Sequence, residues 1–288
     1  MTLSIAHLGP SGTHAETAAI VYADWFWKET GETLSLCPYP SIAQTLLAVT
    51  QGQVDLAIVP VENSVEGSVT FTLDTLWRLD KLQIQQGLVL PIVHALISQA
   101  SSLEAIQTIY SHPQALAQCQ EWLDKFLPQA QLISTNSTTE ALQHLEANSA
   151  SGAIASPRAA QLYQLPMLAC PINDSPDNCT RFWVLSLRPS PGGNHTSLAF
   201  TVHDTPGALV KPLQVFANRG INMSKIESRP TKRSLGDYLF FVDLEADTHD
   251  PGTQAALAEL THETATLKVF GSYNILPAGN GEESSLVL

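Results

Sequence analysis

The sequence predicts an α/β protein of two lobes, followed by a separate βαββαβ domain. Up to Leu187, short apolar runs alternate with helical patterns, which is typical of largely parallel sheets covered by helices. A segment rich in proline and glycine, Arg188–His195, then separates the two parts of the chain. Beyond it, strand and helix patterns follow one another in the order of a ferredoxin-like unit.

Length and composition restrict the class of protein. The 288 residues suffice for two or three domains, and 44% of them are hydrophobic, as in an ordinary globular protein. The net charge of −13 argues against nucleic acid or an anionic membrane as a partner. Four cysteines without a CxxC pair, and a start without an apolar leader, predict reduced thiols and a cytoplasmic protein with no membrane span.

The first elements form a strand, a turn and a helix. The strand covers Leu3–Leu8, the turn Gly9–Thr13 and the helix Ala15–Lys28. The turn lies at a helix N-terminus, where free N–H groups and the macrodipole favour an anion, and Ser11 and Thr13 add hydroxyl donors. A plain N-cap would explain the same residues.

A polar cluster follows the next predicted strand. A helix over 41–50 leads to a buried strand over 54–61, which ends at the cluster Glu62–Val69, just before the helical pattern of Leu73 and Leu76. In parallel sheets, ligands bind beyond the carboxyl ends of strands. The cluster is therefore either a binding site or an elaborate helix cap.

The middle of the chain repeats this arrangement. A strand region over 88–97 precedes the short strand Ile109–Tyr110, which leads into the polar segment Ser111–Cys119 with Gln118 on a helix. The remaining elements of this half are a strand over 132–135, a capped helix over Thr138–Asn148 and a strand over 152–156.

Asp177–Leu187 leads from polar residues into an alternating apolar run, so we expect a loop that delivers Thr180 and Arg181 at the mouth of a strand. In one interpretation they begin an ordinary strand, with a satisfied hydroxyl and a solvated guanidinium. In the other, both groups are presented together to an anionic substrate.

The C-terminal part reads as a compact domain with a loose tail. The tail covers 277–288. The expected elements are a strand over 197–203, a helix over 207–218, strands over 221–228 and 238–245, a helix over 251–262 and a strand over 267–273.

Several motifs together resemble the prephenate dehydratase family with its ACT regulatory domain. The first three are Gly9-Pro10-x-Gly12-Thr13, Glu62-Asn63-Ser64 followed by Glu66-Gly67-Ser68-Val69, and Ser111-His112-Pro113-Gln114 with Gln118. Thr180-Arg181-Phe182 is similar to the family signature, while Asp204–Val210 and Ile226–Pro230 resemble the phenylalanine-binding motifs of the ACT domain. The chain departs from the family at His14 and Ala15, where an aromatic residue and a serine are usual.

The resemblance implies the fold and the domain limits. The catalytic domain would cover 1–187 with a bilobal, periplasmic-binding-protein-like (type 2) shape, and the ACT domain would cover 196–276. Within the catalytic domain, one lobe would cover approximately 1–80 together with 165–187, and the other would cover 81–164. A linker would cover 188–195 and a flexible tail 277–288.

The resemblance also implies a reaction. Prephenate would lose water and CO2 to give phenylpyruvate in L-phenylalanine biosynthesis, a lyase reaction that needs no cofactor or metal. L-Phenylalanine bound to the ACT domain would inhibit the enzyme, and such sensing implies a homodimer or homotetramer. Two alternatives are an arogenate dehydratase and a non-catalytic amino-acid-binding regulator.

Site residues are carried over from the family motifs. Thr180 would act at the leaving hydroxyl as donor or general acid, although Glu62 could be the acid if burial raised its pKa. The other expected catalytic residues are Asn63 and Arg181. The expected substrate-binding residues are Ser11, Gly12, Thr13, Ser64, Ser111, Gln118 and Phe182, although Phe182 also suits the core. The expected phenylalanine-binding residues are Gly207, Ala208, Leu209, Val210, Asn222, Glu227, Ser228, Arg229 and Pro230.

Overall fold

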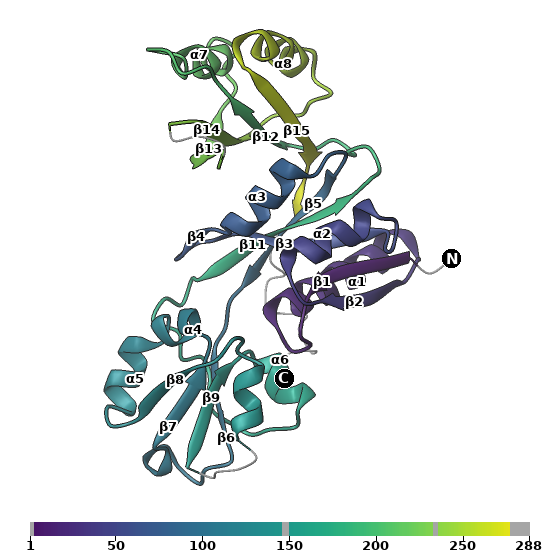
Figure 1. Ribbon diagram of the computed structural model, residues 1–288. Coiled ribbons are helices and arrows are strands. Elements are labelled where there is room, and N and C mark those ends of the chain that lie inside the picture. Colours follow the sequence, from purple (N-terminus) through teal and green to yellow (C-terminus); the bar gives the residue numbers. More distant parts are fainter. Residues whose placement is uncertain (1–2, 146–149, 233–235, 277–288) are drawn as a thin grey trace.

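The computed structural model describes residues 3–145, 150–232 and 236–276, which form two α/β lobes and a C-terminal domain. The first lobe lies between the C-terminal domain and the second lobe (Figure 1). The expected tail over 277–288 lies outside the described residues. Among the helices that the structure describes, none has the length and apolar character needed to cross a membrane.

The first lobe is a mixed sheet in the order β2-β1-β3-β11-β5-β16, with β4 paired to β3. β1 runs parallel to β2 and β3, whereas β11 runs antiparallel to β3 and β5. Its strands are β1 (Leu3–Leu8), β2 (Leu34–Tyr39), β3 (Leu56–Asn63), β4 (Gly67–Ser68), β5 (Gln83–Pro91), β11 (Cys179–Ser186) and β16 (Ile275–Leu276).

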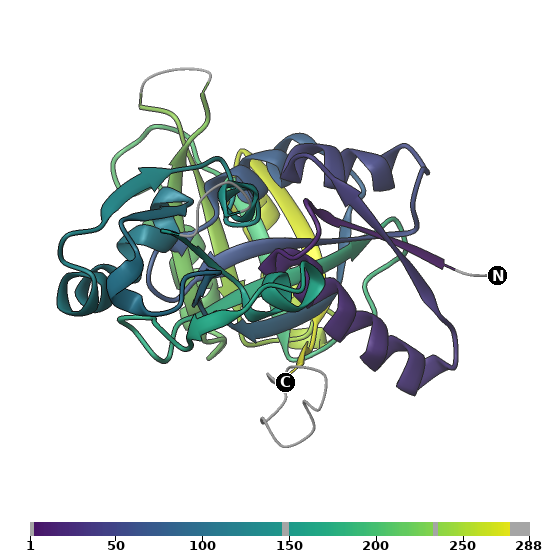
Figure 2. The same cartoon turned by 90° about the horizontal axis from the view of Figure 1, so that it is seen from below.

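Helices cover both faces of this sheet. α1 (His14–Thr30) packs on one face through Ala15, Ala18 and Tyr22. α2 (Ile42–Thr50) and α3 (Thr70–Arg78) pack on the other. Figure 2 shows α1 and α2 on opposite sides of the strands. Thr13 and Ser41 cap α1 and α2 by accepting hydrogen bonds from backbone N–H groups of the first turn.

The second lobe repeats the same arrangement in the order β8-β7-β9-β6-β10. β7 runs parallel to β8 and β9, and β6 runs antiparallel to β9 and β10. The strands are β6 (Ala95–Ser98), β7 (Thr108–Ser111), β8 (Gln131–Ser134), β9 (Ser151–Ala155) and β10 (Met167–Ala169). The helices are α4 (Pro113–Ala117), α5 (Gln120–Phe126), α6 (Pro157–Leu162) and the 3₁₀ turns Leu103–Ala105 and Glu140–His144.

Two antiparallel segments join the lobes. Ile92–His94 crosses from β5 to β6, and the chain returns over 170–178. The backbone N–H of Ile92 donates to Asn178 O at 2.8 Å, and that of Ile172 donates to His94 O at 3.0 Å. The first strand after each crossing runs antiparallel to its neighbours: β6 in the second lobe and β11 in the first. This is the predicted type 2 arrangement of periplasmic-binding-protein-like folds.

Several predicted limits differ from the structure. β5 was expected in the second lobe but pairs with β11 in the first, and β10 was expected in the first lobe but pairs with β6 in the second. β16 leaves the C-terminal domain and adds to β5. The strand predicted over 88–97 is interrupted because this segment passes between two sheets. The helix predicted over Thr138–Asn148 begins as a 3₁₀ turn, and its last residues lie outside the described ranges.

The C-terminal domain has the predicted βαββαβ order, with a sheet arranged β13-β14-β12-β15. Its helices pack on one face through Val215, Phe216, Ala256 and Leu260. The elements are β12 (His195–Thr201), α7 (Val210–Ala217), β13 (Met223–Pro230), β14 (Tyr238–Leu244), α8 (Pro251–Glu263) and β15 (Thr266–Tyr273).

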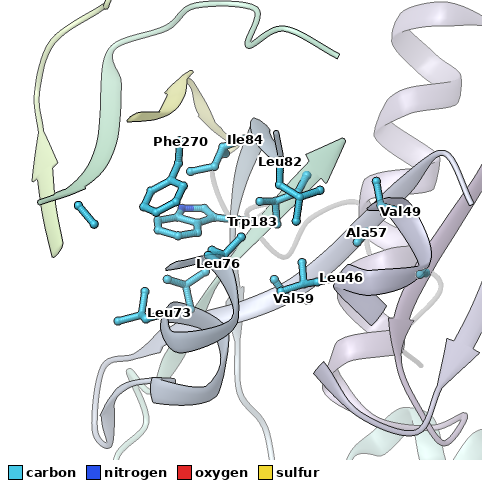
Figure 3. Close-up of a cluster of buried hydrophobic side chains, with 14 of the residues drawn as sticks. Leu46, Val49, Ala57, Val59, Leu73, Leu76, Leu82, Ile84, Trp183 and Phe270 are labelled. Atoms are coloured by element: carbon cyan, nitrogen blue, oxygen red, sulfur yellow. The ribbon is translucent and has the colours of Figure 1, made fainter. Parts of the chain in front are cut away.

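The other face of the C-terminal sheet is buried against the first lobe. Phe270 lies beside Trp183, close to Leu73 and Leu76 (Figure 3). The Trp183 indole Nε1–H also donates to the Tyr273 hydroxyl at 3.0 Å across the same contact. The domain is therefore fastened to the back of β11, a strand that also reaches the junction of the two lobes.

Candidate active site at the junction of the lobes

Asn63 and Thr180 meet where the lobes join. They are paired in the register of β3 and β11, and each is 7% exposed. The Asn63 Nδ2 amide donates to Thr180 Oγ1 at 3.0 Å and to Asn178 Oδ1 at 2.7 Å. Asn63, at the end of β3, thus positions the Thr180 hydroxyl near the start of β11.

Backbone hydrogen bonds determine the orientation of the Asn63 amide. Its Oδ1 accepts from the N–H groups of Val65 and Glu66 at 3.0 and 2.9 Å. The group that faces Thr180 must therefore be the NH2, which can only donate. Since the Thr180 oxygen accepts in this contact, the hydroxyl hydrogen remains available for an acceptor on a bound molecule.

The network continues into the second lobe. The Asn178 Nδ2 amide donates to Gln118 Oε1 at 3.1 Å, and the Gln118 Nε2 amide donates to Glu66 Oε1 at 3.3 Å. The Ser64 hydroxyl donates to Asn178 Oδ1 at 3.4 Å and accepts from the Cys179 N–H at 3.0 Å. Gln118 ends α4, so residues of both lobes orient the same amides.

Asn178 belongs to the site but to none of the predicted site residues: it is 2% exposed and forms hydrogen bonds with both Asn63 and Gln118. One signal was available. Asn178 lies two residues before Thr180, and residues two apart on an extended chain project to the same side. Glu66, the acceptor for Gln118, is predicted by the sequence only as a member of the polar cluster Glu62–Val69.

The turn before α1 forms a contact between the lobes. Thr13 caps α1 by accepting from Glu16 N–H at 3.3 Å, as the simpler interpretation predicted. The Gly12 N–H donates to Glu16 Oε2 at 2.7 Å, so a carboxylate of the chain itself already occupies this helix end. Ser156, the N-cap of α6, donates to Gly12 O at 2.6 Å, and Arg158 Nε on α6 lies 3.1 Å from Glu16 Oε2. Ser11 is partly buried in the same turn.

Two residues expected to bind substrate are used within the fold. Ser111 is completely buried at the end of β7, and its hydroxyl donates to Ile154 O at 2.6 Å. Phe182 is 1% exposed and packs with Ile58 and Val184 on the α1 face of the first sheet. Both side chains are thus engaged in contacts within their own lobe and not with Thr180.

The side chains of Glu62 and Arg181 lie away from Thr180, although both residues are expected to act beside it. Arg181 Nη2 lies 3.3 Å from Glu62 Oε2, and Nη1 lies 3.0 Å from Asp243 Oδ2 of the C-terminal domain. Lys225 Nζ lies 3.1 Å from Glu62 Oε1. Adjacent residues of a strand project to opposite faces, so Arg181 faces the C-terminal domain while Thr180 faces the lobe junction.

A β-bulge places Glu62 on that second face. Arg181 pairs with Glu62 and Phe182 pairs with Pro60, which leaves Val61 as an extra residue in β3. The extra residue reverses the alternation, so Asn63 falls on the side of Thr180 and Glu62 on the side of Arg181. Burial raises the pKa of Asp243, and the nearby Ser197 hydroxyl and Arg181 guanidinium oppose that rise.

A model of the prephenate dehydratase family matches residues 5–190. The chain belongs to the prephenate dehydratase family. A model of the ACT domain matches residues 196–262, in agreement with the βαββαβ unit described above. The fold class and the family expected from the sequence are thus confirmed.

Individual relatives agree with this assignment. A bifunctional chorismate mutase/prephenate dehydratase of Aquifex aeolicus is 42% identical over 274 residues, which cover 94% of this chain and 73% of the relative. The prephenate dehydratase of Lactococcus lactis subsp. cremoris is 36% identical and covers 96% of this chain and 99% of its own. A solved prephenate dehydratase of Arthrobacter aurescens, in complex with L-Phe, is 34% identical with a TM-score of 0.83, covering 94% of this chain and 90% of its own.

Within the ACT domain, the two motifs expected to bind phenylalanine lie on different elements. Gly207 to Val210 form the turn into α7, where Gly207 has a φ of +79° and Val210 is 61% exposed. Ser228 and Pro230 are exposed at the end of β13, and Asn222, before β13, donates to Glu245 Oε2 at 2.8 Å.

Glu227 and Arg229 of the second motif lie on the side of β13 that faces the catalytic domain. Arg229 Nε lies 2.8 Å from Asp74 Oδ1 on α3, and Arg229 Nη1 lies 3.6 Å from Glu227 Oε1. Glu227 also lies 3.8 Å from Lys225. Alternation along β13 therefore divides this family motif between an exposed face and the contact between the domains.

Departures from the family at positions 14 and 15 have different surroundings. Ala15 is buried against the first sheet, where a methyl group suffices for packing. His14 begins α1, and its ring lies 5.6 Å from that of His94, measured between centroids. Within the described ranges, no group of three or more His, Cys, Asp or Glu residues is arranged to hold a metal ion.

Proposed function

We propose that this chain converts prephenate to phenylpyruvate, water and CO2 at the junction of its two lobes. The observation that carries the proposal is the hydrogen bond from the Asn63 amide to Thr180 Oγ1, which leaves the hydroxyl hydrogen free to donate. Membership of the family supports the reaction, and the buried network around Thr180 supports the location.

The reaction requires little from the protein beyond help for the leaving hydroxyl. Loss of the ring carboxylate supplies an electron pair, loss of the ring hydroxyl accepts it, and aromatisation drives the step. Thr180 would donate to the departing oxygen. A threonine hydroxyl is a weak acid, so a strong hydrogen bond in a water-poor site describes its role better than complete proton transfer.

The position of Glu62 favours Thr180 over Glu62 as the donor. The Glu62 carboxylate lies 3.3 Å from Arg181 Nη2 and 3.1 Å from Lys225 Nζ. Both contacts hold the Glu62 side chain on the face of the first sheet that is turned to the ACT domain, opposite to the face of Thr180. We therefore assign Glu62 and Arg181 to the contact with the ACT domain rather than to the reaction.

Substrate entry requires the lobes to separate, because Thr180 and Asn63 are each 7% exposed. The contacts that would rearrange are the hydrogen bond from Ser156 to Gly12 and the ion pair of Arg158 with Glu16. The segments Ile92–His94 and 170–178 would serve as the hinge.

We further propose that L-phenylalanine binds the ACT domain near Gly207–Val210 and Glu227–Pro230 and inhibits the reaction. Support comes from the ACT match and from the Arthrobacter relative, which was solved with L-Phe. Linkage requires that the inhibitor bind the less active state more tightly. The ion pairs from β13 to Glu62 and Asp74 join this region to the catalytic domain.

We expect the protein to form a homodimer or homotetramer. Its cytoplasmic location also stays a prediction. On the ACT domain, Val210 is 61% and Ile226 is 45% exposed, and each belongs to one of the two motifs that resemble phenylalanine-binding motifs. A partner subunit that covered these apolar side chains would complete the site. Light scattering with and without L-phenylalanine measures the oligomeric state.

The experiment for the whole proposal is an assay of phenylpyruvate formation from prephenate, with and without L-phenylalanine. We expect turnover by the wild type and a loss on the order of 10²- to 10³-fold for Thr180→Ala. Thr180→Ser, which keeps a hydroxyl, is the matched control and should retain most activity. Turnover of arogenate instead of prephenate would favour the arogenate dehydratase, and turnover of neither would favour a binding protein.

A further inference from the structure

His94 is a buried histidine with one unused ring nitrogen at the junction of the lobes. It is 3% exposed and lies on the segment that crosses from β5 to β6. Its Nε2 lies 3.0 Å from Gln118 Oε1, whereas Nδ1 is buried and has no hydrogen-bond partner among the described residues. The ring of His14 lies beside it at 5.6 Å and 73°, and His14 Nε2 is likewise buried without a partner within the described part of the chain.

The amide network determines which nitrogen of His94 carries the proton. Backbone N–H groups at Asn63 Oδ1 require the Asn63 amide to donate to Asn178 Oδ1. Asn178 must then donate through Nδ2 to Gln118 Oε1. Because that oxygen can only accept, His94 has to donate to it through Nε2–H.

The contact of the Gln118 Nε2 amide also indicates that Gln118 Oε1 faces His94. Its Nε2 amide lies 3.3 Å from the Glu66 carboxylate, which can only accept when ionised. A neutral His94 therefore presents a bare lone pair at Nδ1. Burial lowers the pKa of His94, so its ring stays neutral near physiological pH, although the hydrogen bond with Gln118 opposes that shift.

A buried acceptor without a donor destabilises a fold, and such atoms usually have a ligand or water as partner. Prephenate matches this requirement. With both carboxylates ionised, prephenate has two carboxylates and a ketone, which only accept, and one ring hydroxyl, which is its single hydrogen-bond donor.

We propose that His94 Nδ1 accepts a hydrogen bond from the ring hydroxyl of the substrate while Thr180 donates to the same oxygen. This inference rests on the proposed function. His94 would orient the hydroxyl so that its lone pair points at Thr180, and it would raise the basicity of that oxygen.

The step balances with a proton from solvent. The C–O bond breaks with its electrons on oxygen, the oxygen keeps its own hydrogen, gains one proton and leaves as water. The C–C bond to the ring carboxylate breaks to release CO2, and its electron pair completes the aromatic ring. His94 thus contacts the same O–H group in the substrate and in the product water.

A structural role is the competing explanation, in which His94 serves only to hold Gln118. Two substitutions separate these roles. His94→Gln places an amide NH2 near the position of Nε2, which preserves the bond to Gln118 and removes the Nδ1 acceptor. His94→Asn places an amide oxygen near Nδ1 and removes the bond to Gln118.

The test compares phenylpyruvate formation from prephenate by wild type, His94→Gln and His94→Asn. We expect His94→Gln to lose roughly 10- to 100-fold in kcat, as one substrate hydrogen bond is removed, and His94→Asn to retain more activity. The reverse order, or equal losses, would overturn the inference. No turnover by the wild type would instead remove the proposed function on which it rests.

Inhibition by added phenylpyruvate provides the second measurement, since this product lacks the ring hydroxyl. We expect His94→Gln to leave its inhibition constant unchanged and to impair only steps that involve the hydroxyl. A parallel loss of affinity for phenylpyruvate would indicate general damage to the site and would contradict the assignment. Melting temperatures and L-phenylalanine calorimetry report whether each variant is folded.

Discussion

Thr180 and Arg181 are neighbours on β11, but their side chains lie on opposite faces of the first sheet. Thr180 Oγ1 accepts from Asn63 at the lobe junction, while Arg181 Nη1 lies 3.0 Å from Asp243 of the ACT domain. A displacement of β11 by the ACT domain would therefore move the proposed catalytic hydroxyl directly.

Replacing Arg181 tests this connection. Arg181→Met leaves the buried Asp243 without its cation, so we expect a loss of about 1–3 kcal/mol in the free energy of unfolding and weaker inhibition by L-phenylalanine. Addition of Asp243→Asn should restore part of the stability, because it removes the unpaired charge. Urea unfolding and inhibition curves measure the two effects.

The control for Arg181 is Lys211, whose ion pair with Glu263 is on the ACT surface and whose side chain is 72% exposed. Lys211→Met should change stability by less than about 1 kcal/mol. Equal effects of the two substitutions, or unchanged inhibition in Arg181→Met, would contradict a special role for this contact.

Asn178 should be required for the orientation of the site amides. Asn178→Asp removes the NH2 that donates to Gln118 and places a carboxylate near Asn63, Ser64 and Gln118. We expect kcat/KM for prephenate to fall on the order of 10²-fold or more. Asp177→Asn, an exchange of the same two groups at an exposed neighbouring position, should leave activity near the wild-type value.

The burial of His14 should make the stability of the protein depend on pH. Burial lowers the pKa of His14 from 6.5 to about 3, with a further contribution from His94. The unfolded chain then binds a proton that the folded chain does not, so stability present above pH 6.5 is lost as the pH falls toward the folded-state pKa.

His14→Phe removes this proton uptake. The difference in unfolding free energy between wild type and variant should change by about 1.4 kcal/mol per pH unit between roughly pH 6 and pH 4, with the wild type losing more. Urea unfolding across that range measures it. Parallel pH profiles for the two proteins would show that His14 does not titrate as the structure requires.

Gly12 should tolerate no side chain at the contact between the lobes. Its φ is +87°, and an added Cβ would lie 3.2 Å from Ala159 Cβ of the second lobe. Gly12→Ala combines the strain of a left-handed backbone, about 1 kcal/mol or more, with crowding across the lobes, so we expect lower stability and lower kcat/KM.

Gly52→Ala is the matched control for Gly12. Gly52 has a φ of +69° with nothing within 4 Å of the added Cβ, so it costs backbone strain alone. It should destabilise the protein without a change in kcat/KM. Similar kinetic effects at both positions would exclude a specific role for the Gly12 contact.

Motifs and periodicity were sufficient for the family, the two-lobe α/β fold and the βαββαβ domain, because these depend on local patterns along the chain. The lobe limits were less accurate. The residues of β5 and β10 do not indicate which sheet each strand joins, because that depends on where the chain crosses between the lobes.

The motifs around Asn63 and Thr180 and the order of the domains can be predicted from residues that are close together in the chain. Which side chains of those motifs face one another depends on how the strands pair. The extra residue Val61 in β3 reverses the alternation, and it brings Asn63 to Thr180 and Glu62 to Arg181. The pairing of His94 with Gln118 depends on the packing of the crossing segment against the end of α4, which no spacing along the chain encodes.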